Sequence, residues 1–268
     1  MELSNKEKKR LKGKYPHWAI VTGASSGIGL ALAEALASCG MDLVINARNE
    51  TQLEHLATKW ENEYHIQVIV VAADLSQAEG VALLIEKTAS LSVSLLITAA
   101  GFGTSGAFVG GELDTEINML RLNCEAVLRL SHHFAQQFKA QGAGGLVLFG
   151  SLVGFQGTAY ATAYAATKAF VQVFAEGLGV ELTPYGVDVL GVAPGPVQTG
   201  FGDRAAMDMG GATPVEKIVQ PTLAALGRQG TVVPGSFAKF LYSSLALLPR
   251  WAKVQVMSKI MKGMAGHQ

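Results

Sequence analysis

The chain has 268 residues, of which 49% are apolar and 16% charged, and its 21 basic side chains balance its 21 acidic ones. This composition supports a globular core and argues against a nonspecific DNA- or RNA-binding protein, which would carry an excess of positive charge. Its two cysteines, Cys39 and Cys124, lack the spacing of a disulfide framework or a zinc site, so we expect no metal and a reducing, cytoplasmic location.

The first eighteen residues are basic and contain no apolar run that could form the core of a signal peptide. Lys and Arg side chains are concentrated between Lys6 and Lys14. We therefore predict that residues 1–15 form a flexible, solvated tail, with contact to an anionic surface as the alternative. Near the other end, the apolar stretch 237–249 contains a lysine and is too short to span a bilayer.

From Trp18 onward, short apolar runs alternate with longer stretches of helical character. Strands are predicted at WAIVT, DLVINA, QVIVVAA, SLLIT, GLVLFG and VDVLGVA, and the longest helices at 113–138 and about 159–182. Continuous apolar runs are typical of parallel strands that are buried on both faces. The repeat predicts an α/β fold: a single doubly wound Rossmann-type domain with a parallel sheet flanked by helices. Residues 16–235 form its body, and residues 236–268 a helical extension of the same domain.

The first strand runs directly into TGASSGIG, residues 22–29, which then opens a helix. Gly23, Gly27 and Gly29 permit a tight turn, a close approach of the backbone to a pyrophosphate, and close packing of the helix on the strand. The helix N-terminus adds amide donors and the positive end of its dipole. Between a strand and a helix, this turn predicts a dinucleotide site rather than a purely structural loop.

The second strand ends at Ala47 and Arg48. An NAD-binding protein usually places a carboxylate here for the ribose hydroxyls, whereas the 2′-phosphate of NADP requires a cation and no acid. Ala47 and Arg48 fit the phosphate and predict NADP(H). The alternative is that Arg48 caps the strand or pairs with Glu50 or Glu54.

The segment YAATK places Tyr164 and Lys168 four residues apart on a predicted helix, where their Cβ atoms would lie roughly 5–6 Å apart. A phenol with a pKa near ~10 is a poor base at neutral pH, and a nearby ammonium group favours the phenolate. Ser151 ends a predicted strand, at the sheet edge where ligands bind in such folds. These three residues predict proton-transfer chemistry; the alternative for the pair is a solvated surface contact.

Taken in order, TGASSGIG, AADL, TAAG, Asn123, Ser151, YAATK and PGPVQT closely resemble the short-chain dehydrogenase/reductase family. The resemblance covers about residues 16 to 200, and the glycine spacing is similar to that of the smaller dehydrogenases. It implies that Tyr164 is the general acid/base, that Lys168 holds the nicotinamide ribose and lowers the pKa of Tyr164, and that Ser151 binds the reacting oxygen.

The same resemblance implies that Asn123 holds a water molecule in a proton relay to Lys168; the alternative is a satisfied polar group inside a packed helix. Asp74 would bind the adenine amino group, with helix capping as the rival role. Val197 and Thr199 would meet the nicotinamide carboxamide. The complete set of expected cofactor contacts is Gly23, Ser25, Ser26, Gly27, Ile28, Gly29, Arg48, Asp74, Leu75, Ala99, Ala100, Gly101, Tyr164, Lys168, Pro194, Gly195, Val197 and Thr199.

The sequence departs from the family pattern at three places. TAAG has Thr98 and Ala99 where a pair of asparagines is usual, so the central strand must be supported differently. Ser26 stands where many NADP-preferring relatives have a second basic residue, which leaves Arg48 as the main phosphate contact. Gly150 is an unusually flexible neighbour for Ser151.

These features predict an NADP(H)-dependent oxidoreductase that interconverts a carbonyl and an alcohol, and the resemblance implies a homodimer or homotetramer assembled through the two longest helices. The glycine-rich loops at 101–111 and 200–211 carry few charges and favour an apolar small-molecule substrate. The alternative is a noncatalytic NADP-binding protein that acts through a partner. A methyltransferase would share the glycine turn but would leave YAATK and PGPVQT unexplained.

The C-terminal extension carries an apolar stripe with a helical period, formed by Trp251, Val254, Met257, Ile260 or Met261, and Met264. Lys and Arg side chains surround the stripe. We expect it to pack on its own domain and help enclose an apolar substrate, because a methionine-rich surface adapts to such ligands. The alternatives are packing on a neighbouring subunit and, least favoured, contact with a membrane surface.

Overall fold

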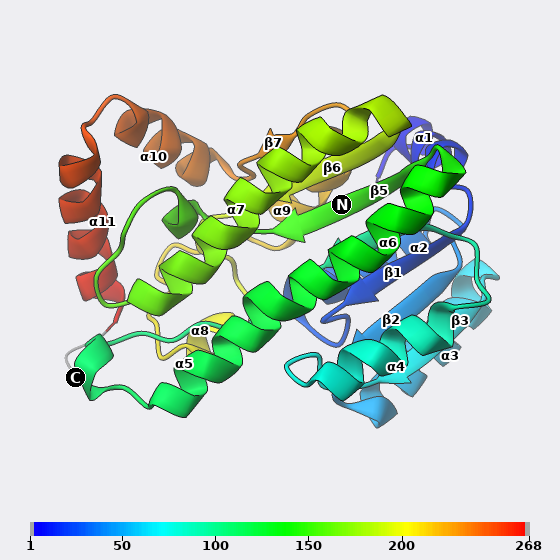
Figure 1. Ribbon diagram of the computed structural model, residues 1–268, viewed down its shortest axis with the longest axis horizontal. Helices are drawn as coiled ribbons and strands as arrows, with labels where there is room; N and C mark the ends of the chain where they lie inside the picture. Colours follow the sequence, from blue (N-terminus) through cyan, green and yellow to red (C-terminus); the bar gives the residue numbers. More distant parts are fainter. Residues whose placement is uncertain (1–2, 266–268) are drawn as a thin grey trace.

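The computed structural model describes residues 3–265, which form one parallel sheet of seven strands in the order β3-β2-β1-β4-β5-β6-β7 (Figure 1). The strands are β1 (Trp18–Thr22), β2 (Leu43–Ala47), β3 (Val68–Ala72), β4 (Val93–Thr98), β5 (Gly144–Phe149), β6 (Val187–Val192) and β7 (Thr231–Val232). The order reverses beside β1, which is the crossover that places a ligand crevice at the carboxyl ends of the strands. The predicted doubly wound α/β fold is confirmed.

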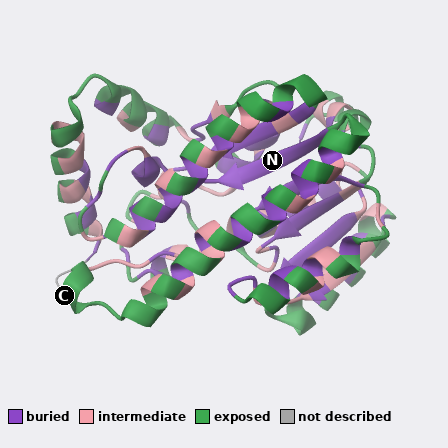
Figure 2. Ribbon diagram, in the orientation of Figure 1, coloured by how far each residue is buried: buried purple, intermediate pink, exposed green. Residues whose placement is uncertain are grey.

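Helices cover both faces of the sheet and bury the strands between them (Figure 2). One face packs against α2 (Gly27–Ala37), α3 (Glu50–Tyr64) and α9 (Glu216–Ala225). The other packs against α4 (Ala78–Thr88), α6 (Val127–Gln141) and α7 (Thr162–Leu182). Aliphatic side chains from both sides of each strand fill these two cores, which explains the continuous apolar runs in the sequence.

The predicted helix at 113–138 is interrupted in the structure. Between α5 (Leu113–Leu120) and α6 the chain makes a π-helical turn, η2 (Arg121–Ala126), before the regular helix resumes. A π turn inserts one residue and rotates the side chains that follow. It carries the buried Asn123, whose amide bonds to a loop across from it. Periodicity in the sequence does not reveal this turn because its flanks are both helical.

The N-terminal segment is largely helical, although the sequence predicts that it forms a flexible tail. Residues Asn5–Lys14 form α1, and the hydroxyl of Ser4 accepts a hydrogen bond from the Glu7 amide at its start. Leu11 and Tyr15 are fully buried against the sheet. Two apolar anchors in a basic segment are a weak signal by themselves, and the surface that they meet comes from distant parts of the chain.

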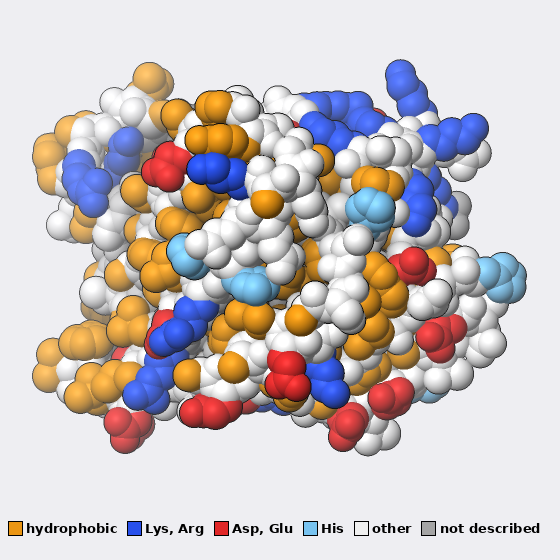
Figure 3. Space-filling view, turned by 45° about the vertical axis from the view of Figure 1, so that its right-hand side comes forward, with side chains coloured by type: hydrophobic (Ala, Val, Ile, Leu, Met, Phe, Trp, Pro, Cys, Tyr) orange, Lys and Arg blue, Asp and Glu red, His pale blue; other side chains and the backbone are white. Residues whose placement is uncertain are grey.

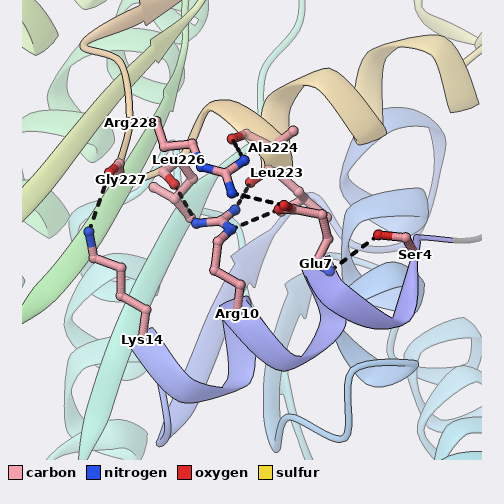
Figure 4. Close-up of polar contacts among 9 residues, drawn as sticks. All are labelled: Ser4, Glu7, Arg10, Lys14, Leu223, Ala224, Leu226, Gly227 and Arg228. Atoms are coloured by element: carbon pink, nitrogen blue, oxygen red, sulfur yellow. Dashed lines mark hydrogen bonds and ion pairs between the residues drawn. The ribbon is translucent and has the colours of Figure 1, made fainter.

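Polar contacts join α1 to the end of α9 (Figure 4). The guanidinium of Arg10 donates to the carbonyl oxygens of Leu223, at 2.6 Å, and Leu226, at 2.9 Å. Glu7 pairs with Arg10 and, at 2.9 Å, with Arg228. Many cations of α1 remain at the surface, and Figure 3 shows Lys and Arg side chains gathered at the upper right over this helix.

The chain beyond β6 forms a second group of helices, which lies at the carboxyl ends of the strands. After the short α8 (Phe201–Arg204), α10 (Ser236–Ala246) and α11 (Arg250–Met264) form a hairpin that stands away from the sheet, at the left in Figure 1. The remaining short turns are η1 (Phe108–Gly110), η3 (Leu152–Phe155) and η4 (Thr183–Tyr185). Within residues 3–265, no helix is long and apolar enough to cross a membrane.

Removing the Arg10 guanidinium tests whether α1 is an integral part of the fold. We expect Arg10→Ala to lower the free energy of unfolding by roughly 1.5–3 kcal/mol, because it removes charge-assisted hydrogen bonds to two carbonyl groups. Urea denaturation monitored by circular dichroism measures the change. Lys9→Ala, at an exposed position of the same helix, is the control and should be nearly neutral. Equal stability of the two variants would show that α1 is not docked in solution.

Candidate active site

A cavity of about 540 Å³ opens at the carboxyl ends of the strands. It is lined by every residue of the expected cofactor set and by Ser151. Of the residues expected to take part in catalysis or cofactor binding, Asn123 alone does not line it. The cavity therefore brings together the end of β2 and six of the seven ordered motifs, all but Asn123, as the sequence predicts for the ends of parallel strands.

The glycine turn after β1 has the backbone shape that a bound pyrophosphate requires. Gly23 and Gly27 adopt φ values of 68° and 57°, which favour glycine. A Cβ atom at Gly29 would collide with the carbonyl of Gly23, so this helix can pack closely on the turn only with glycine there. The side chain of Ser26 does not cap α2, and the first amide groups of the helix remain available to an anion. The turn fits a dinucleotide.

The end of β2 carries the expected cation. Ala47 and Arg48 both line the cavity, and Arg48 is exposed. Within the described part of the chain Arg48 forms no ion pair, with Glu50, Glu54 or any other carboxylate. The neighbouring Asn46 is buried and donates to the carbonyl of Val71 at 2.9 Å, which ties β2 to β3 beneath the site.

Asp74 lies in the loop between β3 and α4, beside the cavity. It lines the cavity, and its Oδ1 accepts a hydrogen bond from the Ser76 amide at 2.9 Å. This contact shapes the loop before α4 rather than capping the helix, since Gln77 is the residue at the N-cap. A carboxylate accepts several hydrogen bonds, so the turn leaves acceptor capacity for a ligand.

Tyr164 and Lys168 lie on the buried side of α7, one turn apart. The ammonium group of Lys168 donates to the carbonyl oxygen of Phe149, at the end of β5, over 2.9 Å and lies 5.8 Å from the centre of the Tyr164 ring. Ser151 follows two residues after Phe149, and its hydroxyl interacts with Tyr164. The helix and the strand end thus converge on the same point, and the surface-pair alternative for YAATK is wrong.

Burial dominates the acid–base properties of this cluster. It raises the pKa of Tyr164 to about 12, while the hydrogen bond with Ser151 acts in the opposite direction. It lowers the pKa of Lys168 to about 8. The phenol therefore keeps its proton at neutral pH, and Lys168 remains mainly charged. The expected lowering of the Tyr164 pKa by Lys168 is not met in the chain by itself, because desolvation has the larger effect.

Asn123 lies behind the loop that follows β4 and does not reach the cavity. Its amide donates to the Phe102 carbonyl at 2.8 Å and to Thr167 Oγ1 at 3.1 Å, and its Oδ1 accepts from the Phe102 amide at 3.2 Å. These contacts match the satisfied-polar-group alternative. A Cβ at Gly101 would lie 2.9 Å from Asn123 Oδ1 and 3.5 Å from Lys168 Nζ, so glycine keeps the two side chains adjacent.

Two departures from the family pattern, at TAAG and at Gly150, have structural counterparts. Thr22 Oγ1 accepts a hydrogen bond from the Ala100 amide at 3.0 Å, which links β1 to the chain after β4. A Cβ at Gly150 would lie 3.2 Å from Gln172 Oε1 and 3.5 Å from the Lys168 and Val192 carbonyl oxygens. Gly150 is therefore a tightly packed position, and the small residue lets α7 approach β5.

An apolar wall, which the motifs do not reveal, completes the cavity. The ring of Phe201 in α8 packs 5.5 Å from that of Tyr164. The other wall residues come from the segments around α8, α10 and α11: Met207, Met209, Phe237, Leu241, Met257, Ile260, Met261 and Met264. The predicted stripe of the C-terminal helix thus packs on its own domain at four positions, whereas Trp251 is exposed.

Similar proteins share the sequence pattern and the fold of this chain. A family model described as short chain dehydrogenase matches residues 17–209. The 7β-hydroxysteroid dehydrogenase of Clostridium sardiniense is 32% identical over 186 residues, or 69% of this chain and 71% of that protein. A solved 7β-hydroxysteroid dehydrogenase structure covers 92% of this chain and 98% of its own, with a TM-score of 0.84 and 26% identity. A short-chain dehydrogenase from Sphingobium yanoikuyae in complex with NADPH covers 90% and 94%, with a TM-score of 0.78 and 31% identity.

The chain belongs to the short-chain dehydrogenase/reductase family. It is an oxidoreductase of this family, whose members use nicotinamide cofactors and act on small molecules. The family and the enzyme class predicted from the ordered motifs are confirmed.

The lowered pKa of Lys168 can be measured in the free enzyme. With ¹³C-labelled lysine, the NMR resonance of Lys168 should titrate with a midpoint near pH 8 as its ammonium group loses a proton with rising pH, below the value of about 10.4 for lysine in a model peptide. Lys168→Arg identifies the resonance by removing it. A midpoint equal to that of the exposed lysines would show that the ammonium group is hydrated rather than buried.

Proposed function

We propose that the protein catalyses the NADP(H)-dependent interconversion of a carbonyl and an alcohol on an apolar small molecule, with Tyr164 as the general acid/base. The observation that supports this most directly is the buried cluster of Tyr164, Ser151 and Lys168 in the wall of a cavity that also contains the glycine turn. A noncatalytic nucleotide-binding protein would have no use for a buried phenol beside a serine and a lysine.

The nicotinamide supplies or accepts the hydride when it is bound. In the direction of reduction, the hydroxyl groups of Ser151 and Tyr164 hydrogen-bond the carbonyl oxygen, and Tyr164 transfers its proton to that oxygen as negative charge develops on it. The raised pKa of Tyr164 keeps this proton in place until then. Lys168, held by the Phe149 carbonyl, supplies positive charge beside the ring and donors for the cofactor ribose.

The end of β2 favours NADP(H) over NAD(H). Ala47 offers no carboxylate to the ribose hydroxyls, and the guanidinium of Arg48, which pairs with no carboxylate among residues 3–265, can bind a 2′-phosphate with charge-assisted hydrogen bonds. The Sphingobium yanoikuyae relative was solved with NADPH, which is consistent with this preference.

The wall opposite Tyr164 favours an apolar substrate. Methionine side chains from α11 and the segment after α8 combine polarizable sulfur with flexible rotamers, and they adapt to bulky apolar ligands. The hydroxysteroid activity named for the Clostridium sardiniense relative is of this kind. We extend to this chain only the chemical class, a largely apolar ketone or secondary alcohol.

We also propose that the enzyme is a homodimer or homotetramer in the cytoplasm. Apolar side chains lie exposed on the outer faces of α5, α6 and α7, among them Ile117, Leu120, Leu128, Phe170 and Val173. Buried apolar surface of this kind stabilises subunit contacts. Cys39 and Cys124 are free thiols, which fits a reducing compartment.

Replacing the proposed acid tests the mechanism. Tyr164→Phe keeps the ring but removes the proton, so kcat for NADPH-dependent ketone reduction should fall by roughly 10²–10⁴ while NADPH binding persists. Stopped-flow absorbance at 340 nm measures turnover, and nucleotide fluorescence measures binding. Tyr185→Phe, at an exposed position in η4, is the control. Near-normal turnover of Tyr164→Phe would contradict the assignment.

A carboxylate at position 47 tests the cofactor preference. Ala47→Asp should repel the 2′-phosphate and accept hydrogen bonds from the ribose hydroxyls, which moves the ratio of kcat/KM for NADH over NADPH upward at least tenfold, or about 1.4 kcal/mol. The asparagine of Ala47→Asn has nearly the same size as aspartate but no charge, so this variant separates the electrostatic effect from the steric one. If the wild-type enzyme already prefers NADH, the role assigned to Arg48 is wrong.

A further inference from the structure

The outer face of the α10–α11 hairpin exposes large apolar side chains. Phe240 in α10 is 70% exposed, Leu247 in the turn is 89% exposed, and Trp251 at the start of α11 is 72% exposed. Leu248 lies beside them and is also exposed. We call these four residues the hairpin face. Large apolar side chains gathered on one exposed hairpin indicate a surface that contacts something apolar.

The inner side of the same hairpin is already occupied by protein. Ala238 and Leu245 of α10 are buried, as are Met257 and Met261 of α11, which line the cavity. The predicted apolar stripe of α11 is thus largely satisfied within the chain. The hairpin face points the other way, and no described part of the chain covers it (Figure 2).

The charge on the hairpin has one sign. Residues 236–264 contain Lys239, Arg250, Lys253, Lys259 and Lys262 and no Asp or Glu, although the whole chain has a formal net charge of zero. None of these five cations forms an ion pair within residues 3–265. Hydrophobic and Lys or Arg side chains lie together at the upper left of Figure 3, where Figure 1 places the hairpin. The complementary partner is apolar and anionic.

We propose that the hairpin face docks on the surface of a bilayer that contains anionic lipids. Leu247, Leu248 and Trp251 at the tip would enter the interface between headgroups and acyl chains, and the flanking cations would meet the headgroups. An exposed tryptophan is typical of such an interface. The docked element lies in the interface plane and does not span the membrane, in keeping with its length.

A second copy of the chain fits the face less well. The other strongly exposed apolar segment, around Val109 and Leu113, is flanked by Glu112 and Asp114 and could meet the hairpin face of a neighbour. That contact would be heterologous, because the two surfaces differ, and it would build rings or open chains of subunits rather than a two-fold symmetric dimer. In Figure 1 the turn between α10 and α11 lies at the end of the hairpin that points away from α5. The acids at the start of α5 are therefore not beside the tip that would dock on the membrane.

Docking would place the cavity beside the lipid phase. Phe237 in α10 lines the cavity and is itself 55% exposed, so the hairpin carries an exposed apolar side chain at the cavity as well. If the proposed function holds, an apolar ketone or alcohol dissolved in the bilayer could reach the methionine wall without crossing water. This consequence rests on the proposed function, whereas docking itself does not.

Vesicle flotation of the full chain tests the proposal. We expect the protein to bind vesicles of phosphatidylcholine with 30% phosphatidylserine, and to bind pure phosphatidylcholine vesicles more weakly. Added salt should weaken binding to the vesicles that contain phosphatidylserine. The double variant Leu247→Ser/Trp251→Ser should lose at least tenfold in apparent affinity. Arg250→Gln/Lys253→Gln should lose affinity for the anionic vesicles alone.

Matched controls separate the hairpin face from general stickiness and general charge. Val109→Ser changes a side chain that is 97% exposed and lies outside the hairpin, and this variant should bind as the wild type does. Lys6→Gln/Lys9→Gln removes two exposed cations from α1, at the other end of the molecule, and should also leave binding unchanged. Losses equal to those of the hairpin variants would overturn the proposal.

Two further measurements distinguish the remaining outcomes. If the wild type does not bind anionic vesicles, the proposal is wrong. The proposal is also wrong if the Leu247→Ser/Trp251→Ser variant has a lower mass than the wild type in light scattering but the same flotation, because the hairpin face then belongs to a protein contact. Turnover of a water-soluble ketone with NADPH should be unchanged in the double variant. If neither the wild type nor any variant turns over the ketone while flotation is intact, the result contradicts the proposed function rather than the docking proposal.

Discussion

The hydrogen bond between the Lys168 ammonium group and the Phe149 carbonyl is the contact on which the active site depends. It joins α7 to the end of β5 and replaces water around a buried charge. Tyr164 lies one turn before Lys168, and Ser151 lies two residues after Phe149, so this contact links the two elements that carry the phenol and the hydroxyl. Without it, a buried ammonium group would lack a partner, and its desolvation would destabilise the fold.

Tight packing makes that contact possible and also sets the chemistry. Gly101 and Gly150 leave space only for hydrogen atoms beside Asn123, Lys168 and Gln172, which allows α7 to approach the sheet. The resulting exclusion of water raises the pKa of the phenol and lowers that of the ammonium group. Burial therefore keeps the acid protonated, which is the form that carbonyl reduction needs.

The two ends of the chain serve opposite edges of the sheet. Near the amino ends of the strands, α1 inserts Tyr15, whose hydroxyl donates to Asp188 at the start of β6 over 2.7 Å. At the carboxyl ends, α10 and α11 enclose the cavity and expose a second apolar face. Stability and ligand contact are thus assigned to segments that lie far apart in the molecule.

The sequence alone determined the features that depend on neighbours along the chain. The apolar strands, the glycine turn at 22–29 and the Tyr164–Lys168 spacing are local patterns, and parallel strands necessarily bring their carboxyl ends to one edge. Only the tertiary structure decided that α1 is docked, because Arg10 meets carbonyl groups more than 200 residues away. It likewise turned Asn123 toward the Phe102 backbone and left the hairpin face uncovered. Those outcomes depend on which surfaces meet across the fold, and no local period or motif encodes such contacts.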